Sequence, residues 1–176
     1  VLVRAYAGLV DTQAAREVIA ETRRVVAHLK WILPMIDALE AELFLSLGQV
    51  DAAAEWARRA ELSPEVAPLP ARELLYTTYA RLLIRQGQAQ SALALLQPLE
   101  ERVRSGGRQA RRMTLLVLQA LAHDALGARL QAFARLADAL RLAAPDGYLR
   151  RFLKEGAPLL ALLQAYRVAG APAAAP

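Results

Sequence analysis

The fold of this chain is decided by a stretch of thirteen residues, Ala41-Glu42-Leu43-Phe44-Leu45-Ser46-Leu47-Gly48-Gln49-Val50-Asp51-Ala52-Ala53. Its central glycine has an alanine seven residues before it and another five residues after it. The same frame surrounds Gly87 and Gly127, at spacings of 39 and 40 residues, and Gly8 lies 40 residues upstream of Gly48. A fixed period of this size is typical of helical hairpins that bury their apolar faces on their neighbours. We therefore predict an all-α fold, a right-handed α-solenoid with a repeat of about 40 residues.

The recurring small residues have an architectural role in this prediction. Glycine adopts the left-handed conformation that ends a helix at low cost, so each turn glycine is expected there. The flanking alanines are expected where the two helices of a hairpin approach most closely. These alanines are Ala41, Ala53, Ala80, Ala92, Ala120 and Ala132.

The predicted organisation is one repeat domain over residues 1–168. Its hairpins are expected at about 1–30, 31–62, 71–104 and 108–143, with shorter terminal helices at 148–168 and an Ala/Pro-rich linker at 169–176. Pro34 suits the first turn of a helix. Because the chain opens at Val1 inside a predicted helix and closes in a linker-like segment, we expect a longer parent protein.

Composition narrows the class of protein. The chain has 176 residues, 56% of them hydrophobic, a net charge of +5 and no cysteine. The apolar run from Met113 to His123 is interrupted by Thr114 and Gln119, so it is too short to span a bilayer. No signal peptide is recognisable, which favours a reducing, cytoplasmic setting without a membrane partner. The arginine pairs are spread over successive hairpins without interleaved aromatic residues, which favours solvated helix faces over a nucleic-acid groove.

Catalytic and metal-binding patterns are missing from the sequence. There is no phosphate-binding GxxxxGK[ST] loop, and Ser105-Gly106-Gly107-Arg108 is better explained as the end of one helix and the start of the next. His28 and His123 have no partner at metal-ligand spacing. Trp31 and Trp56 are interpreted as packing anchors. We predict a protein that is not an enzyme and holds no metal.

Several stretches resemble one bacterial family. The spacing of small residue, turn glycine and small residue is similar to tetratricopeptide (TPR) repeats. Glu55-Trp56-Ala57, the run from Tyr79 to Gly87, and above all Pro145-Asp146-Gly147-Tyr148 through Glu155-Gly156-Ala157-Pro158 resemble the C-terminal part of the sensor arm in MalT-like regulators. These are large ATP-binding members of the LuxR family of transcription factors, and the resemblance covers about residues 31–168.

The resemblance implies a function and places two activities outside this chain. It implies an arm that senses a small-molecule inducer or a regulatory protein, with ATP bound by an upstream module and DNA bound by a downstream helix-turn-helix. The alternative is a free-standing TPR-like scaffold that docks a protein segment in its groove. The identity of the effector and the oligomeric state are left open by the sequence.

A concave groove is the expected binding surface of such an array, lined by the first helix of each hairpin. Arg81 and Arg85, one helical turn apart, are the best candidates for holding a carboxylate or phosphate. Met35 contributes to the apolar wall. The predicted polar groove residues are Glu42, Ser46, Thr77, Arg81, Arg85, Thr114 and Asp124.

Overall fold

The computed structural model describes residues 12–65, 72–143, 152 and 154–170. Within these ranges the regular elements are all helices, which confirms the prediction of an all-α protein. The chain divides into two compact units, Val1–Gln86 and Gly87–Pro176. The two helices expected to form the third hairpin belong to different units. Gly8, residues 144–151 and the last part of the expected linker, 171–176, lie outside the described residues.

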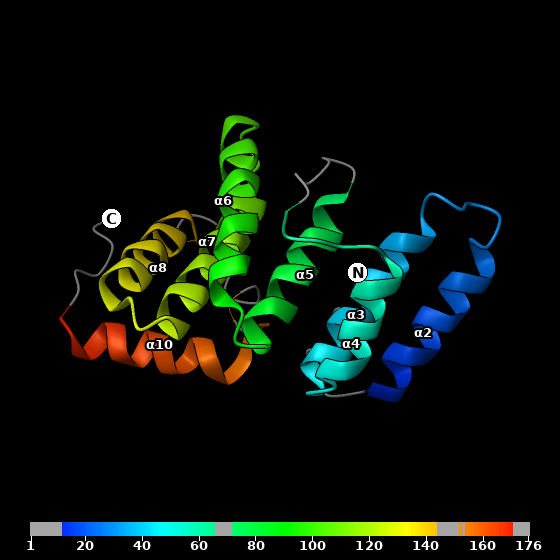
Figure 1. The fold of residues 1–176 in the computed structure, drawn as a ribbon, viewed down its shortest axis with the longest axis horizontal. Helices are drawn as coiled ribbons and strands as arrows, with labels where there is room; N and C mark the ends of the chain where they lie inside the picture. The colour runs from blue at the N-terminus through cyan, green and yellow to red at the C-terminus, as the bar shows by residue number, and fades with distance from the viewer. Residues whose placement is uncertain (1–11, 66–71, 144–151, 153, 171–176) are drawn as a thin grey trace. The chain divides into compact units, whose positions relative to one another are not determined.

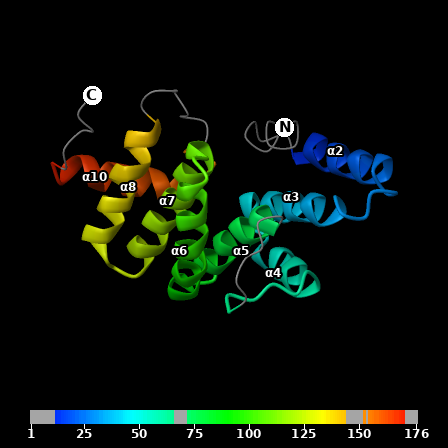
Figure 2. The ribbon, with the colours of Figure 1, turned by 90° about the horizontal axis from the view of Figure 1, so that it is seen from above.

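The first unit is organised around one helix that contacts three others. Its helices are α2 (Thr12–Val25), α3 (Leu33–Ser46), α4 (Val50–Arg59) and α5 (Glu73–Arg85). Helix α3 contacts all of them and lies between α2 and the other two (Figure 2). Ala15 and Ile19 of α2 pack on Ile36 and Leu43 of α3. This apolar cluster fixes the position of α2.

The second unit repeats this plan with α7 at its centre. Its helices are α6 (Ala89–Ser105), α7 (Gln109–Ala125), α8 (Arg129–Ala143) and α10 (Gly156–Val168), which are coloured from green to red in Figure 1. Helix α7 contacts the other three. The rings of Phe133 on α8 and Tyr166 on α10 meet edge to face, with centroids 5.4 Å apart. Every residue of α7 from Leu115 to Ala122 is buried, which is the pattern of a helix covered on all sides.

The turn glycines adopt the predicted left-handed conformation. Gly48 has φ +73° and Gly127 has φ +72°. After α7, the Gly127 amide donates to the Asp124 carbonyl at 2.9 Å and the Ala128 amide donates to the His123 carbonyl at 2.9 Å. This is the Schellman hydrogen-bond pattern, which satisfies carbonyls left free at a helix end. Gly48 and Gln49 make the same pair of bonds after α3.

Helix α4 ends in the same way without a glycine. Glu61 has φ +51°, its amide donates to the Arg58 carbonyl, and the Leu62 amide donates to the Ala57 carbonyl. A side chain in this region is strained, so a sequence reading that looks for glycine does not find this turn. The hairpin was predicted to run to about residue 62, slightly beyond the observed end of α4 at Arg59.

The predictions for the flanking alanines, Pro34 and Trp56 are confirmed, and the prediction for Trp31 is wrong. All six flanking alanines are 0% exposed. Pro34 lies in the first turn of α3, as predicted. Trp56 is buried and acts as a packing anchor, but Trp31 is 71% exposed, so its interpretation as an anchor was wrong. Helix α2 ends at Val25 and does not continue to residue 30. Trp31 therefore lies outside the helix and does not pack in a helix interface.

Replacing Gly127 by alanine tests the left-handed turn. A Cβ atom at Gly127 would have nothing within 4 Å, so the expected loss comes from backbone strain alone. We expect the free energy of unfolding to fall by about 1 to 2 kcal/mol, measured by urea denaturation. Gly106→Ala is the matched control, because Gly106 has φ −85°. An equal loss in both variants would show that the conformation of Gly127 is not the cause.

Candidate functional site

Three of the predicted groove residues lie in a buried polar cluster in the first unit. Arg81 Nη1 of α5 lies 3.1 Å from Glu42 Oε1 of α3, and Thr78 Oγ1 donates to the same carboxylate oxygen at 3.3 Å. Glu42 and Arg81 are each 8% exposed. Thr77 is also buried, and its hydroxyl donates to the Glu73 carbonyl at 2.7 Å. The structure thus brings Glu42 and Arg81 together as partners of each other.

The other predicted groove residues are placed apart from this cluster. Ser46 is exposed and donates to the Leu43 carbonyl at 2.7 Å. Arg85 is exposed, and it makes no ion pair with any residue in the described ranges. In the second unit, Thr114 donates to the Ala110 carbonyl and Asp124 pairs with Arg129. Since Arg81 already has a carboxylate partner, Arg85 is the member of the predicted arginine pair that is open to solvent.

A polar hollow of about 340 Å³ lies within the second unit. Three helices supply its walls: α6 and α8 on the sides and α7 between them. Its volume lies near the lower limit of about 300 Å³ for ligand pockets, and it is about half open to solvent. Its lining residues are Gln97, Glu100 and Glu101 of α6, Gln119 and His123 of α7, and Gln131, Ala134 and Arg135 of α8.

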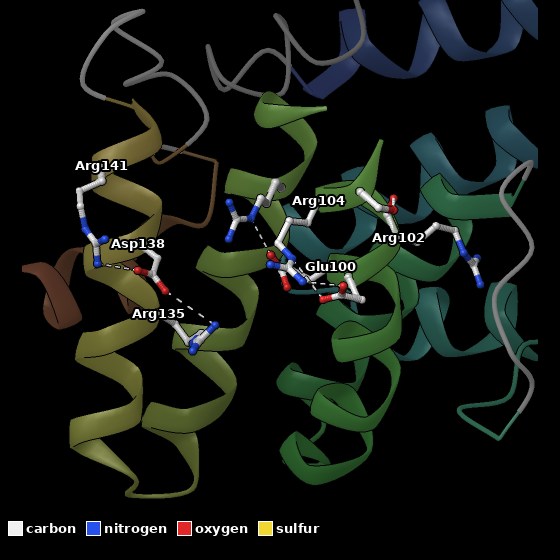
Figure 3. A network of polar contacts seen from close by, with 9 residues as sticks. Glu100, Arg102, Arg104, Arg135, Asp138 and Arg141 are labelled. Atoms are coloured by element: carbon white, nitrogen blue, oxygen red, sulfur yellow. Dashed lines mark hydrogen bonds and ion pairs between the residues drawn. The ribbon is translucent and has the colours of Figure 1, made fainter. Parts of the chain in front are cut away.

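Ion pairs hold the charged side chains around this hollow (Figure 3). Glu100 Oε1 accepts from Arg112 Nε at 2.6 Å, and Glu101 Oε1 lies 2.6 Å from Arg104 Nη2. Arg135 is held less closely, because its Nη1 lies 3.7 Å from Asp138. Asp138 also pairs with Arg141, at 2.6 Å. The guanidinium of Arg135 therefore keeps donors that an incoming carboxylate could use.

Gln119 differs from the other polar residues of the hollow. It is 4% exposed, and its side-chain amide makes no hydrogen bond with any residue that the structure describes. It is also the one polar residue in the buried run from Leu115 to Ala122. Its polar atoms are not fully buried, because Gln119 lines the hollow, and the fully buried side-chain polar atom without a hydrogen bond in the described part of the chain is Trp56 Nε1.

His123 lies one helical turn from Gln119 on α7 and favours its neutral form. Partial burial lowers its pKa below the ordinary value of 6.5, and the positive charge of Arg135 lowers it further. The carboxylates of Glu100 and Glu101 also line the hollow, from α6. A neutral imidazole has one donor and one acceptor nitrogen, so it can bond to either kind of group on a ligand.

Sequence reasoning did not identify the residues of this hollow as a site. The predicted groove residues were chosen by counting back from each turn glycine, a rule that does not select Gln119, His123 or Arg135. The available signal was the glutamine that interrupts the apolar run from Met113 to His123. A single amide inside a run of buried residues marks a place where a polar partner is expected.

The described part of the chain lacks two further kinds of feature. No helix there is both long and apolar enough to cross a membrane. The described residues also contain no group of three or more histidine, cysteine, aspartate or glutamate side chains that could hold a metal ion.

The buried pair of Glu42 and Arg81 predicts a large effect of single substitutions. Arg81→Met leaves the Glu42 carboxylate buried without its cation, and we expect the free energy of unfolding to fall by about 3 kcal/mol. The double variant Glu42→Leu, Arg81→Met should lose clearly less than the sum of the two single variants, because the two charges interact directly with each other. Arg104→Met removes an exposed pair and should leave stability almost unchanged in the same urea titration. Additive losses would contradict a direct interaction.

The lowered pKa of His123 predicts a loss of stability in mild acid. The unfolded chain binds the proton more readily than the folded chain does, so stability should fall as the pH drops below 6.5. His123→Gln should reduce this loss, measured as the difference in unfolding free energy between about pH 7.5 and about pH 5.5. His28→Gln, at an exposed histidine of the first unit, controls for the removal of a histidine. An unchanged pH dependence in His123→Gln would count against the assignment.

Comparison with known proteins gives a family and no individual relative. The family model of the MalT-like TPR region matches residues 2–169. Searches of curated proteins and of solved structures returned no significant match. The family model covers nearly the whole chain, including α3 and α5 with their buried ion pair and the three helices around the hollow. The chain belongs to the family of MalT-like TPR regions.

Proposed function

We propose that this chain is the effector-sensing arm of a LuxR-family transcriptional regulator of the MalT-like class and has no catalytic role of its own. The observation that carries the proposal is the family match over residues 2–169. A regulator of this class works in the cytoplasm, with ATP bound by an upstream module and DNA bound by a downstream helix-turn-helix. The proposed arm is a right-handed solenoid with a repeat of about 40 residues.

The proposed mechanism is a shift between a resting and a DNA-binding state. A ligand moves such an equilibrium only by the difference between its affinities for the two states. A complete switch requires a difference of about 5 kcal/mol, and a partial one requires less. The polar hollow between α6, α7 and α8 supports this role, because a ligand there would contact three helices at once.

The reading frame of the parent gene tests the proposal. We expect a P-loop module upstream of Val1 and a helix-turn-helix of about 60 residues downstream of Pro176. The encoded protein should bind DNA more tightly with ATP than without it, measured by fluorescence anisotropy on fragments of the neighbouring promoters. A gene that encodes neither module would overturn the regulator role and favour a free-standing TPR-like scaffold. A protein segment in the groove would then be the partner to seek.

A further inference from the structure

The carboxylates on the α6 side of the hollow are neutralised by arginines of the chain itself. Glu100 Oε1 accepts a hydrogen bond from Arg112 Nε at 2.6 Å. Glu101 Oε1 lies 2.6 Å from Arg104 Nη2, and the hydrogen bond from Arg104 lowers the pKa of Glu101 below its ordinary value. Each glutamate is therefore paired with a cation, and neither presents an uncompensated negative charge to a ligand.

The α8 side of the hollow carries one positive charge in excess. Asp138 is drawn between two arginines of this helix (Figure 3). Its Oδ1 lies 2.6 Å from Arg141 Nη2, whereas its Oδ2 lies 3.7 Å from Arg135 Nη1. One carboxylate does not compensate two guanidinium groups, which both stay charged at physiological pH. Arg135 is the more loosely held of the two and the one that lines the hollow, so a ligand there would meet its charge.

The pKa of His123 agrees with this distribution of charge. His123 lines the hollow from α7. Burial lowers its pKa, and the positive charge of Arg135 lowers it further, whereas no carboxylate in the described ranges raises it. The charge of Arg135 therefore acts across the hollow as far as α7, and an anion placed between the two helices would be attracted by it.

The remaining lining side chains favour a polar ligand. Gln97, Gln119 and Gln131 contribute one amide from each of the three helices. Each amide both donates and accepts hydrogen bonds, so it can bond to a hydroxyl or a carbonyl group. Gln97 and Gln131 are exposed and can be reached by a ligand from solvent. Ala134 is the one apolar residue of the lining, so a ligand with an apolar body would find little surface to pack against.

We propose that the hollow binds a small monocarboxylate whose body carries hydroxyl or oxo groups. Its carboxylate faces Arg135, and its hydroxyl or oxo groups face the glutamine amides. A second negative charge on the ligand would have no second excess cation to compensate it. A volume of about 340 Å³ suits a body of about three to six carbon atoms. The proposal deepens the sensing role given above by naming the class of effector, and it rests on that role only for the consequence of binding.

The first test is direct binding to the 176-residue chain by calorimetry at constant ionic strength. The probes are lactate, pyruvate, glycerate and gluconate. We expect saturable binding of at least one of them, with a Kd of about 1 mM or tighter. The neutral alcohols of the same skeletons, glycerol for glycerate and sorbitol for gluconate, should bind at least about tenfold more weakly, because they lack the charged contact. The proposal is overturned if no probe binds, if the alcohols bind equally well, or if inorganic phosphate binds as tightly as the best carboxylate.

Substitution of Arg135 tests the charged contact. Its side chain is 39% exposed, so variants at this position are expected to fold. Arg135→Gln should weaken binding of the carboxylate by about tenfold or more, and Arg135→Lys should weaken it less, because lysine keeps the charge. Arg129→Gln is the matched control, because Arg129 is an exposed arginine of α8 that does not line the hollow. An equal loss in Arg129→Gln would reduce the effect to the net charge of the helix and overturn the proposal.

Substitution of Asp138 separates a ligand contact from a structural role of Arg135. Asp138 competes with the ligand for this guanidinium, so Asp138→Asn should tighten binding of the carboxylate by about two- to fivefold. Glu21→Gln, at an exposed ion pair of the first unit, removes the same charge and should leave the affinity unchanged. Unchanged or weaker binding in Asp138→Asn would contradict the proposed contact. These measurements do not depend on the reading frame of the parent gene, so failure of the ligand proposal and failure of the regulator role can be told apart.

Discussion

The structure depends on one helix in each unit that is covered by three others. In the second unit this helix is α7, which contacts α6, α8 and α10 and is buried without interruption from Leu115 to Ala122. A helix in this position has no solvent face, so it must be apolar around its whole circumference. Alanines at the closest approaches complete the arrangement, since both Ala120 and Ala132 are 0% exposed. A fully buried polar group in such a helix needs a hydrogen-bond partner within the protein.

The two units meet this requirement in different ways. In the first, α3 carries the buried carboxylate of Glu42, which receives Arg81 and Thr78 from α5. The charge is paired within the protein, so the cluster orients α3 and α5 relative to each other and leaves little capacity for a ligand. In the second unit, Gln119 has no such partner among the described residues and borders a hollow instead. The amide of Gln119 therefore faces the hollow and is not a fully buried unpaired group.

How far the sequence predicts this protein depends on whether a feature is local or tertiary. The conformation of Gly48 and Gly127, the burial of the flanking alanines and the position of Pro34 follow from backbone geometry and a short repeated pattern, and all were predicted. Glu61 takes the same left-handed turn without a glycine and was not found. The pairing of Arg81 with Glu42 could not be predicted, because it depends on how α5 packs against α3 of the preceding hairpin. Trp31 shows the same limit, since where α2 ends decides that it is exposed.

A ligand in the hollow would act on a continuous set of contacts. The hollow joins α6, α7 and α8, and α8 is joined to α10 by the edge-to-face contact of Phe133 with Tyr166. Helix α7 is fixed by its apolar surroundings, whereas the side walls carry exposed ion pairs that cost little to rearrange. A ligand bound there would contact α6, α7 and α8, so it would favour whichever arrangement of these helices it binds more tightly. Because α10 packs on both α7 and α8, a displacement of α8 changes the environment of the last described helix of the chain. Under the proposed sensing role, the effector shifts the switch by the difference between its affinities for two positions of α8.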